Sequence, residues 1–276
     1  MKSLLKRSIF GLLYALIVAV GLLGPQPLFV FVFAFALLYT LHEFFRMAMG
    51  RSLILSRILL CISALWLFLS LYLSRMGYCI PAWAYLAFIP LLLAFIVPVW
   101  TKEKPQMKEL SYACAALLCV ALPLALTPIL TVRSGAYSGY FLLCIFIITA
   151  LSDVGAYLLG SLLGQRPGAW KLAPKISPKK SWWGVLGGLL MAMSSSLLLS
   201  KLGWLDLGAI HSLCLGALLS VVGLFGDLLE SMWKRHFGVK DSGNLIPGHG
   251  GLYDRLDSVL PAILLSIVYL ELFALL

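Results

Sequence analysis

Charged residues are scarce in this chain. Only 12% of its 276 residues are Asp, Glu, Lys or Arg, whereas 62% are hydrophobic. Soluble domains carry about 25% charged residues, which keep their surfaces in water. The composition therefore excludes a soluble globular domain and predicts an integral membrane protein.

Among the charged residues, acids are the scarcer kind. The chain has 11 Asp and Glu and 21 Lys and Arg, which gives a formal net charge of +10. Lys and Arg are retained on the cytoplasmic side of short membrane loops. With the N-terminus inside, the cations that fall outside are Arg75, Arg133 and Lys201. The positive charge thus indicates topology and an anionic membrane surface, not nucleic-acid binding. We expect a cell (inner) membrane protein with its N-terminus and active site cytoplasmic and its C-terminus outside.

Several motifs that carry chemistry are also missing. The sequence has no G-x-x-x-x-G-K-[ST] phosphate loop, no H-E-x-x-H, no Cys/His zinc spacing and no strand-forming series. Its six cysteines include no CxxC pair and indicate no disulfide framework. A nucleotide would therefore have to be held by membrane helices and the loops between them.

Long apolar runs, by contrast, are plentiful. A helix of about 20 apolar residues crosses a bilayer, and the sequence divides into about nine such segments. They span roughly residues 8–24, 27–42, 53–73, 82–100, 110–130, 138–164, 184–200, 207–229 and 259–276. The sequence thus predicts an all-α, polytopic membrane protein with about nine transmembrane helices.

Little chain remains for anything else. The extensive polar connections are 101–109, 165–181 and 230–258, and none is long enough for a separate soluble domain. A polar site must then lie at the cytoplasmic membrane face. We expect one integral membrane unit, with N-terminal transmembrane helices in 1–135 and a C-terminal catalytic transmembrane region in 136–276.

The longest polar run, Ser231 to Asp257, reads SMWKRHFGVKDSGNLIPGHGGLYDRLD. Its cations or potential cations are Lys234, Arg235, His236, Lys240 and Arg255. Its carboxylates are Asp241, Asp254 and Asp257. Its flexible segment is Gly248-His249-Gly250-Gly251. Cations neutralise phosphate oxygens, carboxylates hold a hard divalent cation, and glycines let backbone N–H groups approach an anion. The run therefore predicts a site for phosphate and metal together.

Acids inside the apolar segments are costly, at about 2.5–3.5 kcal/mol near the bilayer centre. Asp153 lies in the sixth segment and could serve the site, form a helix-to-helix hydrogen bond or pair with a buried cation. Asp227, in the eighth segment, shares one helical face with Glu230, Ser231 and Lys234 at i, i+3, i+4 and i+7. We expect this polar stripe to point at the site.

Asp227 and Asp241 could bind one metal ion only if the chain bends between them. An unbroken helix would separate positions 227 and 241 by about 21 Å. Gly238, after a candidate helix end at 234–236, is the expected break. Asp254 and Asp257 leave two interpretations open, because acids there could also cap the last span.

Other polar residues favour structural roles. His42, Glu43 and Arg46, at the end of the second segment, are expected to be interfacial anchors, and His211 a satisfied intramembrane histidine. A row of small residues at i+4 spacing predicts close helix packing in the sixth segment: Ser152, Ala156, Gly160 and Gly164.

The loop 165–181, QRPGAWKLAPKISPKKS, is a second candidate phosphate binder. Its cations are Arg166, Lys171, Lys175, Lys179 and Lys180. Three prolines prevent a simple amphipathic helix. Positive-inside topology accounts for these cations as well as phosphate binding does, so composition leaves both interpretations open.

Two segments resemble a known family. The pattern S-x-x-K-R-x4-K-D-S-x-x-x-x-P-x-H-G-G-x-x-D-R-x-D, from Ser231, is similar to the signature of the phosphatidate cytidylyltransferases, the CDP-diacylglycerol synthases. SDVGAYLLGSLLG with KLAPKISPKKSWWG is similar to a second family segment, S-D-x-x-A-Y and L-A-P-K-I-S-P-x-K-T-x-E-G. Ser181 replaces Thr and keeps its hydroxyl, whereas Trp183 stands where Glu or Gln is usual.

The resemblance implies an enzyme that transfers CMP from CTP to phosphatidic acid, giving CDP-diacylglycerol and pyrophosphate in phospholipid biosynthesis. It implies Mg²⁺ held by Asp227 and Asp241 and leaves a second cation open. The partners implied are CTP, phosphatidic acid and the lipid bilayer, with no nucleic acid and with a homodimer left open. Such a reaction needs charge stabilisation more than a strong base, because the lipid phosphate is already an anionic nucleophile.

Residues and resemblance together give the predicted site. The predicted catalytic residues are Asp227, Lys240, Asp241, His249, Asp254 and Arg255. The predicted substrate-binding residues are Asp153, Lys171, Lys175, Ser177, Lys179, Lys180, Ser181, Ser231, Lys234, Arg235, Gly250, Gly251 and Asp257. His249 is expected to donate a hydrogen bond to phosphate.

Two other functions fit parts of the pattern. A CTP-dependent lipid kinase of the polyprenol type would use similar cations and metal but would transfer the γ-phosphate. A secondary transporter would explain the intramembrane acids, yet it should place its polar site near the midplane. The polar residues here gather at the inner face instead.

Overall fold

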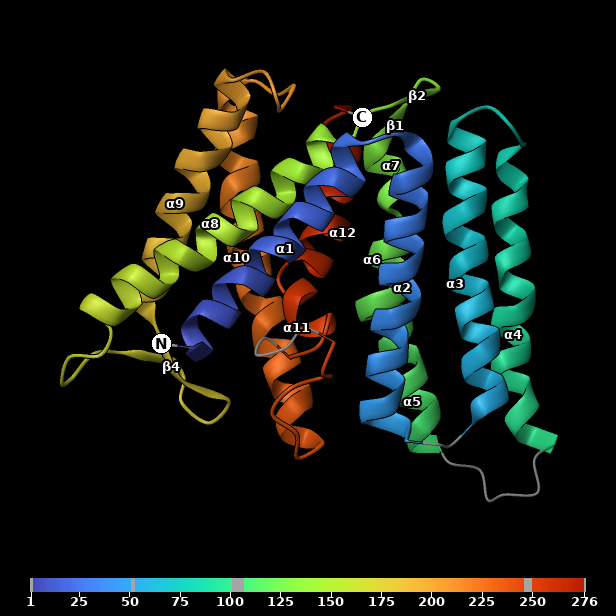
Figure 1. Cartoon of the computed structure of the whole chain (residues 1–276), viewed down its shortest axis with the longest axis horizontal. Helices are drawn as coiled ribbons and strands as arrows, with labels where there is room; N and C mark the ends of the chain where they lie inside the picture. Colours follow the sequence, from blue (N-terminus) through green and yellow to red (C-terminus); the bar gives the residue numbers. More distant parts are fainter. Residues whose placement is uncertain (1, 51–52, 101–106, 246–249, 276) are drawn as a thin grey trace. The chain divides into compact units, whose positions relative to one another are not determined.

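The computed structural model describes residues 2–50, 53–100, 107–245 and 250–275, with side chains from residue 9 onward (Figure 1). Most of the described residues form helices, many of them long and apolar. These helices confirm the predicted all-α, polytopic membrane fold.

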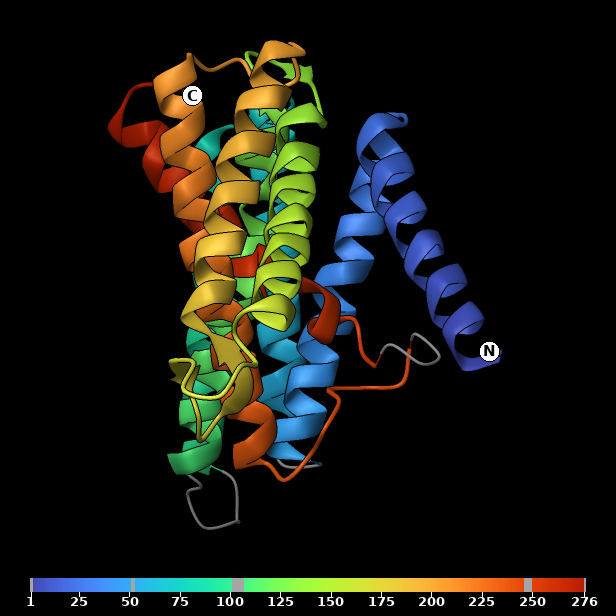
Figure 2. The same cartoon turned by 90° about the vertical axis from the view of Figure 1, so that its left-hand side faces the viewer.

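The N-terminal half of the chain contains helices separated by Gly and Pro. The elements in order are α1 (Lys2–Leu23), α2 (Gln26–Met49), α3 (Ile54–Arg75), η1 (Pro81–Ala87), α4 (Phe88–Ile96), η2 (Val97–Trp100), α5 (Met107–Ala116), η3 (Leu117–Ala121), α6 (Leu122–Ala125), α7 (Thr127–Thr131), β1 (Val132–Arg133) and β2 (Ala136–Tyr137). Prolines stand at the first turns of α2, η1, α6 and α7, where a missing N–H costs no helical hydrogen bond. Figure 2 shows α1 and α2 meeting at Gly24-Pro25 and diverging from there.

The second half has fewer and longer helices. Its elements in order are α8 (Tyr140–Leu162), β3 (Lys171–Ala173), β4 (Ser177–Ser181), α9 (Trp182–Lys201), α10 (Ala209–His236), α11 (Tyr253–Leu256) and α12 (Val259–Leu272). Helix α10 ends at His236, and Gly238 follows with a φ of +68°. The predicted chain break after position 236 is thus confirmed.

Seven helical stretches among the described residues are long and apolar enough to cross a membrane. Two further apolar helices, Ile9–Leu23 and Val259–Leu272, are shorter. The nine predicted segments coincide with these stretches, but the count of nine membrane crossings stays a prediction.

Two short hairpins were not predicted. Strands β1 and β2 pair antiparallel around Ser134 and Gly135, whose φ angles of +49° and +79° suit a tight hairpin turn. Strands β3 and β4 pair antiparallel within the loop 165–181. The prolines of this loop exclude a helix, as expected, and its backbone groups pair across a hairpin instead.

The described chain forms two compact units. The N-terminal unit comprises Met1–Gly139 together with Val239–Arg255, and the C-terminal unit comprises Tyr140–Gly238 together with Leu256–Leu276. In the first, α2, α3 and α4 run side by side (Figure 1). In the second, α8 packs against α9, and α9 packs against α10. The predicted division into 1–135 and 136–276 stays a prediction.

Small residues bring α8 and α9 together. A β-carbon on Gly160 would lie 3.5 Å from the Cα of Gly184, and one on Gly184 would lie 3.1 Å from the carbonyl oxygen of Ala156. Gly155 and Gly187 leave no room for a β-carbon beside each other's carbonyl oxygens. The close packing predicted from the small-residue row is confirmed. His211 is satisfied as predicted, because its Nδ1 lies 2.8 Å from the hydroxyl of Tyr269.

Candidate functional site

Three carboxylates gather in the C-terminal unit. Asp227 and Glu230, from α10, and Asp257, just before α12, each offer an oxygen within 4.8 Å of the others. Gly226 permits this approach, because a β-carbon there would collide with the backbone carbonyl of Asp257. We call these three residues the carboxylate cluster.

Two lysines partly neutralise the carboxylate cluster. Lys180, at the end of β4, forms an ion pair of 2.6 Å with Asp227, and their side chains are 20% and 35% exposed. Lys234 forms an ion pair of 2.5 Å with the buried Glu230. The hydroxyl of Ser231 donates to Asp227 Oδ1 at 3.4 Å. The predicted polar stripe on α10 is therefore confirmed, and Lys180 from the second basic segment joins it.

Asp257 has an unusual proton affinity for a carboxyl group. Burial, followed by the negative charge of Asp227, raises the pKa of Asp257 to about 7, although the backbone N–H of Ser258 donates to it at 2.7 Å and opposes the rise. The charge of the exposed Asp153, on α8, contributes to the same rise. A pKa this high in a cluster of acids signals negative charge that a bound cation would relieve.

The donor set suits a hard divalent cation. Carboxylate oxygens are the ligands that Mg²⁺ takes in proteins, usually with waters and substrate phosphates completing its shell. Asp227 was predicted to be a metal ligand and Asp257 a substrate contact, whereas Glu230 was not predicted to be a site residue. The i, i+3 spacing of Asp227 and Glu230 was the signal that could have identified it.

The β3–β4 hairpin uses several predicted phosphate binders to support itself. Lys171 Nζ donates to the carbonyl of Gly164 at 2.8 Å and to Gln165 Oε1 at 2.9 Å. Ser181 is the N-cap of α9, where its Oγ accepts the N–H of Gly184 at 3.3 Å. These two side chains have structural roles in the hairpin, and their contact with substrate stays a prediction.

The remaining predicted residues of the hairpin are exposed or half-buried. Lys175 and Lys179 are exposed, and Ser177 begins β4 opposite Ala173. Trp183, at the position where the family pattern has Glu or Gln, is 44% exposed in the first turn of α9. Lys175 and Lys179 are therefore free to meet a polyanion, and their role as phosphate binders stays a prediction.

In the N-terminal unit, residues 239–245 and 250–255 form a segment that we call the signature loop. Asp254 links its two parts by hydrogen bonds. Its Oδ2 accepts the backbone N–H and the hydroxyl of Ser242, at 2.9 and 2.8 Å, and the N–H of Gly251 at 2.7 Å. Gly250 has a φ of +84°, and a β-carbon there would lie 2.5 Å from the same oxygen. Gly250, Gly251 and Asp254 thus shape the loop, and any direct part in catalysis stays a prediction.

The structure of the site around Glu43 differs from the prediction. Glu43 is 2% exposed on α2, its Oε2 accepts the N–H of Tyr253 at 2.8 Å, and the same oxygen lies 3.4 Å from the hydroxyl oxygen of Ser242. The expectation of an interfacial anchor is wrong for Glu43, because its carboxylate is buried against the signature loop. A charged residue is rarely so buried without partners, but no pattern in the sequence indicates which residues are the partners of Glu43.

Other predicted residues have less defined surroundings. Arg235, Lys240 and Asp241 are exposed, Arg255 is half-buried, and its carbonyl accepts the hydroxyl of Tyr14 at 3.4 Å. His249 lies outside the described residues. Asp227 and Asp241 belong to different units, so their shared ligation of one metal ion stays a prediction.

Comparison with known proteins agrees with the resemblance. The chain is 45% identical over 132 residues to the phosphatidate cytidylyltransferase of Haemophilus influenzae, covering 46% of this chain and 44% of that one. It is 42% identical over 134 residues to the enzyme of the same name from Mycobacterium tuberculosis, covering 47% and 38%. It is also 42% identical over 135 residues to that of Staphylococcus haemolyticus, covering 48% and 50%.

The matched stretch therefore spans half or less of the length of these curated relatives. The model of the cytidylyltransferase family reaches much further, because it matches residues 5–273 of this chain. On that nearly complete match, the chain belongs to the cytidylyltransferase family.

Proposed function

We propose that this protein transfers CMP from CTP to phosphatidic acid, releasing pyrophosphate. A phosphate oxygen of the lipid attacks the α-phosphorus of CTP, the bond from that phosphorus to the β-phosphate oxygen breaks, and CDP-diacylglycerol forms. The observation that carries this proposal is the carboxylate cluster with Lys180 and Lys234, in a chain of the cytidylyltransferase family.

The cluster matches the difficulty of this reaction. Two polyanions must meet, and charge grows on the pyrophosphate that leaves. Lys180 and Lys234 are paired with carboxylates of the cluster. When CTP binds, each lysine could turn from its carboxylate to a phosphate of the substrate. The lysines would then balance the charge of the triphosphate, and the carboxylates that they leave would need a bound cation as their counter-charge.

Mg²⁺ is the metal that fits these residues. Asp227 and Asp257 would hold it with help from Glu230, and the raised pKa of Asp257 supports a cation at this place. When bound, Mg²⁺ would neutralise the phosphate oxygens of CTP. Asp241 remains a proposed ligand from the signature loop, and a second cation would give it an ion of its own.

No strong general base is required, because phosphatidic acid is an anion at neutral pH and loses no proton on attack. We assign His249 the donation of a hydrogen bond to phosphate, and Lys240, Arg235 and Arg255 the binding of phosphate oxygens. Lys175 and Lys179 on the hairpin would attract CTP toward the site. Glu43 acts only through the signature loop, which it would hold in position for these contacts.

The protein would work in the cell (inner) membrane, with the N-terminus and the site facing the cytoplasm and the C-terminus outside. CTP is cytoplasmic, and phosphatidic acid arrives through the bilayer. A homodimer is compatible with this proposal but not needed for it.

Product analysis tests the reaction directly. Purified protein is incubated with Mg²⁺, phosphatidic acid and CTP labelled at either the α- or the γ-phosphate. We expect the α-label in the lipid and the γ-label in pyrophosphate. A γ-label in the lipid, with CDP released, would instead identify a CTP-dependent lipid kinase and overturn the proposal.

A further inference from the structure

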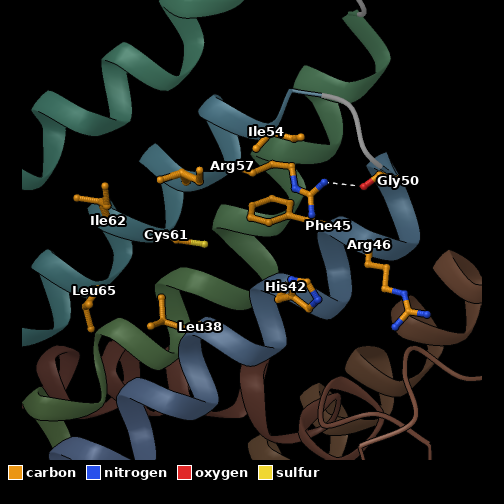
Figure 3. A pocket seen from close by; sticks show the side chains of 11 residues that line it. Leu38, His42, Phe45, Arg46, Gly50, Ile54, Arg57, Cys61, Ile62 and Leu65 are labelled. Carbon is orange, nitrogen blue, oxygen red and sulfur yellow. Dashed lines mark hydrogen bonds between the residues drawn. The ribbon is translucent and has the colours of Figure 1, made fainter.

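A pocket of about 680 Å³ opens between α2 and α3, near the end where α2 stops and α3 begins (Figure 3). Both helices belong to the N-terminal unit. Its size lies within the usual range of ligand sites, about 300–1,000 Å³. The pocket shares no lining residue with the carboxylate cluster or with the signature loop.

Arg57 provides a fixed positive group in this pocket. Its Nη1 donates to the carbonyl of Gly50 at 2.6 Å, and its guanidinium carbon lies 5.5 Å from the ring centre of Phe45. A guanidinium has five N–H donors, and within the described part of the chain Gly50 is its single acceptor. Arg57 is therefore held in one orientation with donors left for an anion.

The charge around Arg57 is uniformly positive or neutral. His42 and Arg46 line the pocket from α2, and among the residues that the structure describes no Asp or Glu lines it. In Figure 3 the Arg46 side chain points away from Arg57, so it adds charge at the rim rather than a second contact. An anchoring arginine would extend into water, whereas Arg57 is retained beside Phe45.

The rest of the pocket is apolar. Ile58, Ile62 and Leu65 follow Arg57 along α3 and line the pocket, and Leu38 lines it from α2. From position 57 to position 65 the helix rises about 12 Å. The pocket thus has one cationic end and one long apolar wall, in a helix pair long and apolar enough to cross a membrane.

We propose that this pocket binds an anionic phospholipid of the bilayer. The lipid phosphate accepts hydrogen bonds from Arg57, His42 lies beside the headgroup, and an acyl chain lies along Ile58, Ile62 and Leu65. Basic pockets between membrane helices on the cytoplasmic side recognise anionic headgroups in this way. The occupant is a lipid rather than free phosphate, because most of the wall has no partner for a soluble anion.

Native mass spectrometry of the purified full-length chain in detergent tests this proposal. The probes are phosphatidylglycerol, which is anionic, and phosphatidylcholine, which has no net charge. We expect phosphatidylglycerol to bind more tightly, and Arg57→Gln to weaken it about tenfold, the effect of one lost charge-assisted contact. Arg75→Gln is the matched control, because it removes the same charge from the far end of α3.

Ile62→Trp keeps every charge and fills the apolar wall, so it should also weaken phosphatidylglycerol binding. Inorganic phosphate should not compete with the lipid at equal concentration. Equal binding of both lipids, or unchanged binding in both variants, would overturn the proposal. Phosphatidylglycerol is not the acceptor in the proposed reaction, so that outcome would leave the proposed function standing.

Discussion

At the scale of single residues, the half-buried Asp257 and the buried Glu43 serve different purposes. Asp257 lies among other carboxylates and has a raised pKa, whereas Glu43 has hydrogen-bond donors from a loop far along the chain. The first arrangement leaves negative charge for a cation, and the second uses the charge to fix the backbone. Each arrangement predicts a different response to mutation.

The pKa of Asp257 predicts how Mg²⁺ binding depends on pH. A group with a pKa of about 7 is mostly protonated at pH 6 and mostly ionised at pH 8. Because a ligand must lose its proton before it binds metal, Mg²⁺ affinity should rise about tenfold from pH 6 to pH 8. Isothermal titration calorimetry measures this change. Asp257→Asn should bind Mg²⁺ weakly at every pH, and a wild-type affinity independent of pH would contradict the account.

Replacing Glu43 should reduce the order of the signature loop. Glu43→Ala removes the acceptor for the N–H of Tyr253, and this lost charge-assisted hydrogen bond is worth about 1.5–3 kcal/mol. We expect a lower thermal unfolding temperature and faster proteolysis within the loop. Glu43→Gln should restore part of both, since its amide oxygen can still accept. Glu271→Gln, an exposed acid at the end of α12, serves as the control; equal effects in all three variants would argue against this role.

At the scale of elements, the lengths of the apolar runs predicted the helices well. The long apolar runs became helices, and the chain break at Gly238 followed from a glycine after a basic helix end. The β3–β4 hairpin was missed because its strands are short and rich in Lys and Pro, which gives no alternating pattern. Glu43 was missed because Ser242 lies 199 positions further along the chain, and sequence spacing cannot reveal so distant a partner.

The packing of α8 on α9 gives a prediction at this scale. A β-carbon on Gly187 would collide with the carbonyl of Gly155 and lie 2.8 Å from Leu159 Cβ. Gly187→Ala should therefore destabilise the protein by about 1–3 kcal/mol, the usual effect of overpacking. Gly160→Ala on the same interface meets its nearest atom at 3.5 Å and gains helix propensity. It should be neutral or stabilising in thermal unfolding, and a reversed order would refute the packing argument.

At the scale of the whole molecule, charge placement predicts orientation in the membrane. Lys240 is exposed in the signature loop, and Lys201 is exposed at the end of α9. In a variant without native cysteines, Lys240→Cys should react with a membrane-impermeant thiol reagent only from the cytoplasmic side, and Lys201→Cys only from outside. Labelling of Lys240→Cys from outside intact cells would reverse the predicted topology.

We propose that the carboxylate cluster carries Mg²⁺-dependent CMP transfer. The most direct measurement is the incorporation of α-labelled CMP into phosphatidic acid by wild type and Asp227→Asn, purified in parallel and matched for thermal stability. Asp206→Asn, an exposed acid outside the cluster, is the control. We predict that Asp227→Asn loses at least a hundredfold in kcat/KM, about 2.7 kcal/mol, while Asp206→Asn stays within twofold of wild type. Wild-type transfer by a folded Asp227→Asn protein at saturating Mg²⁺ would contradict the account.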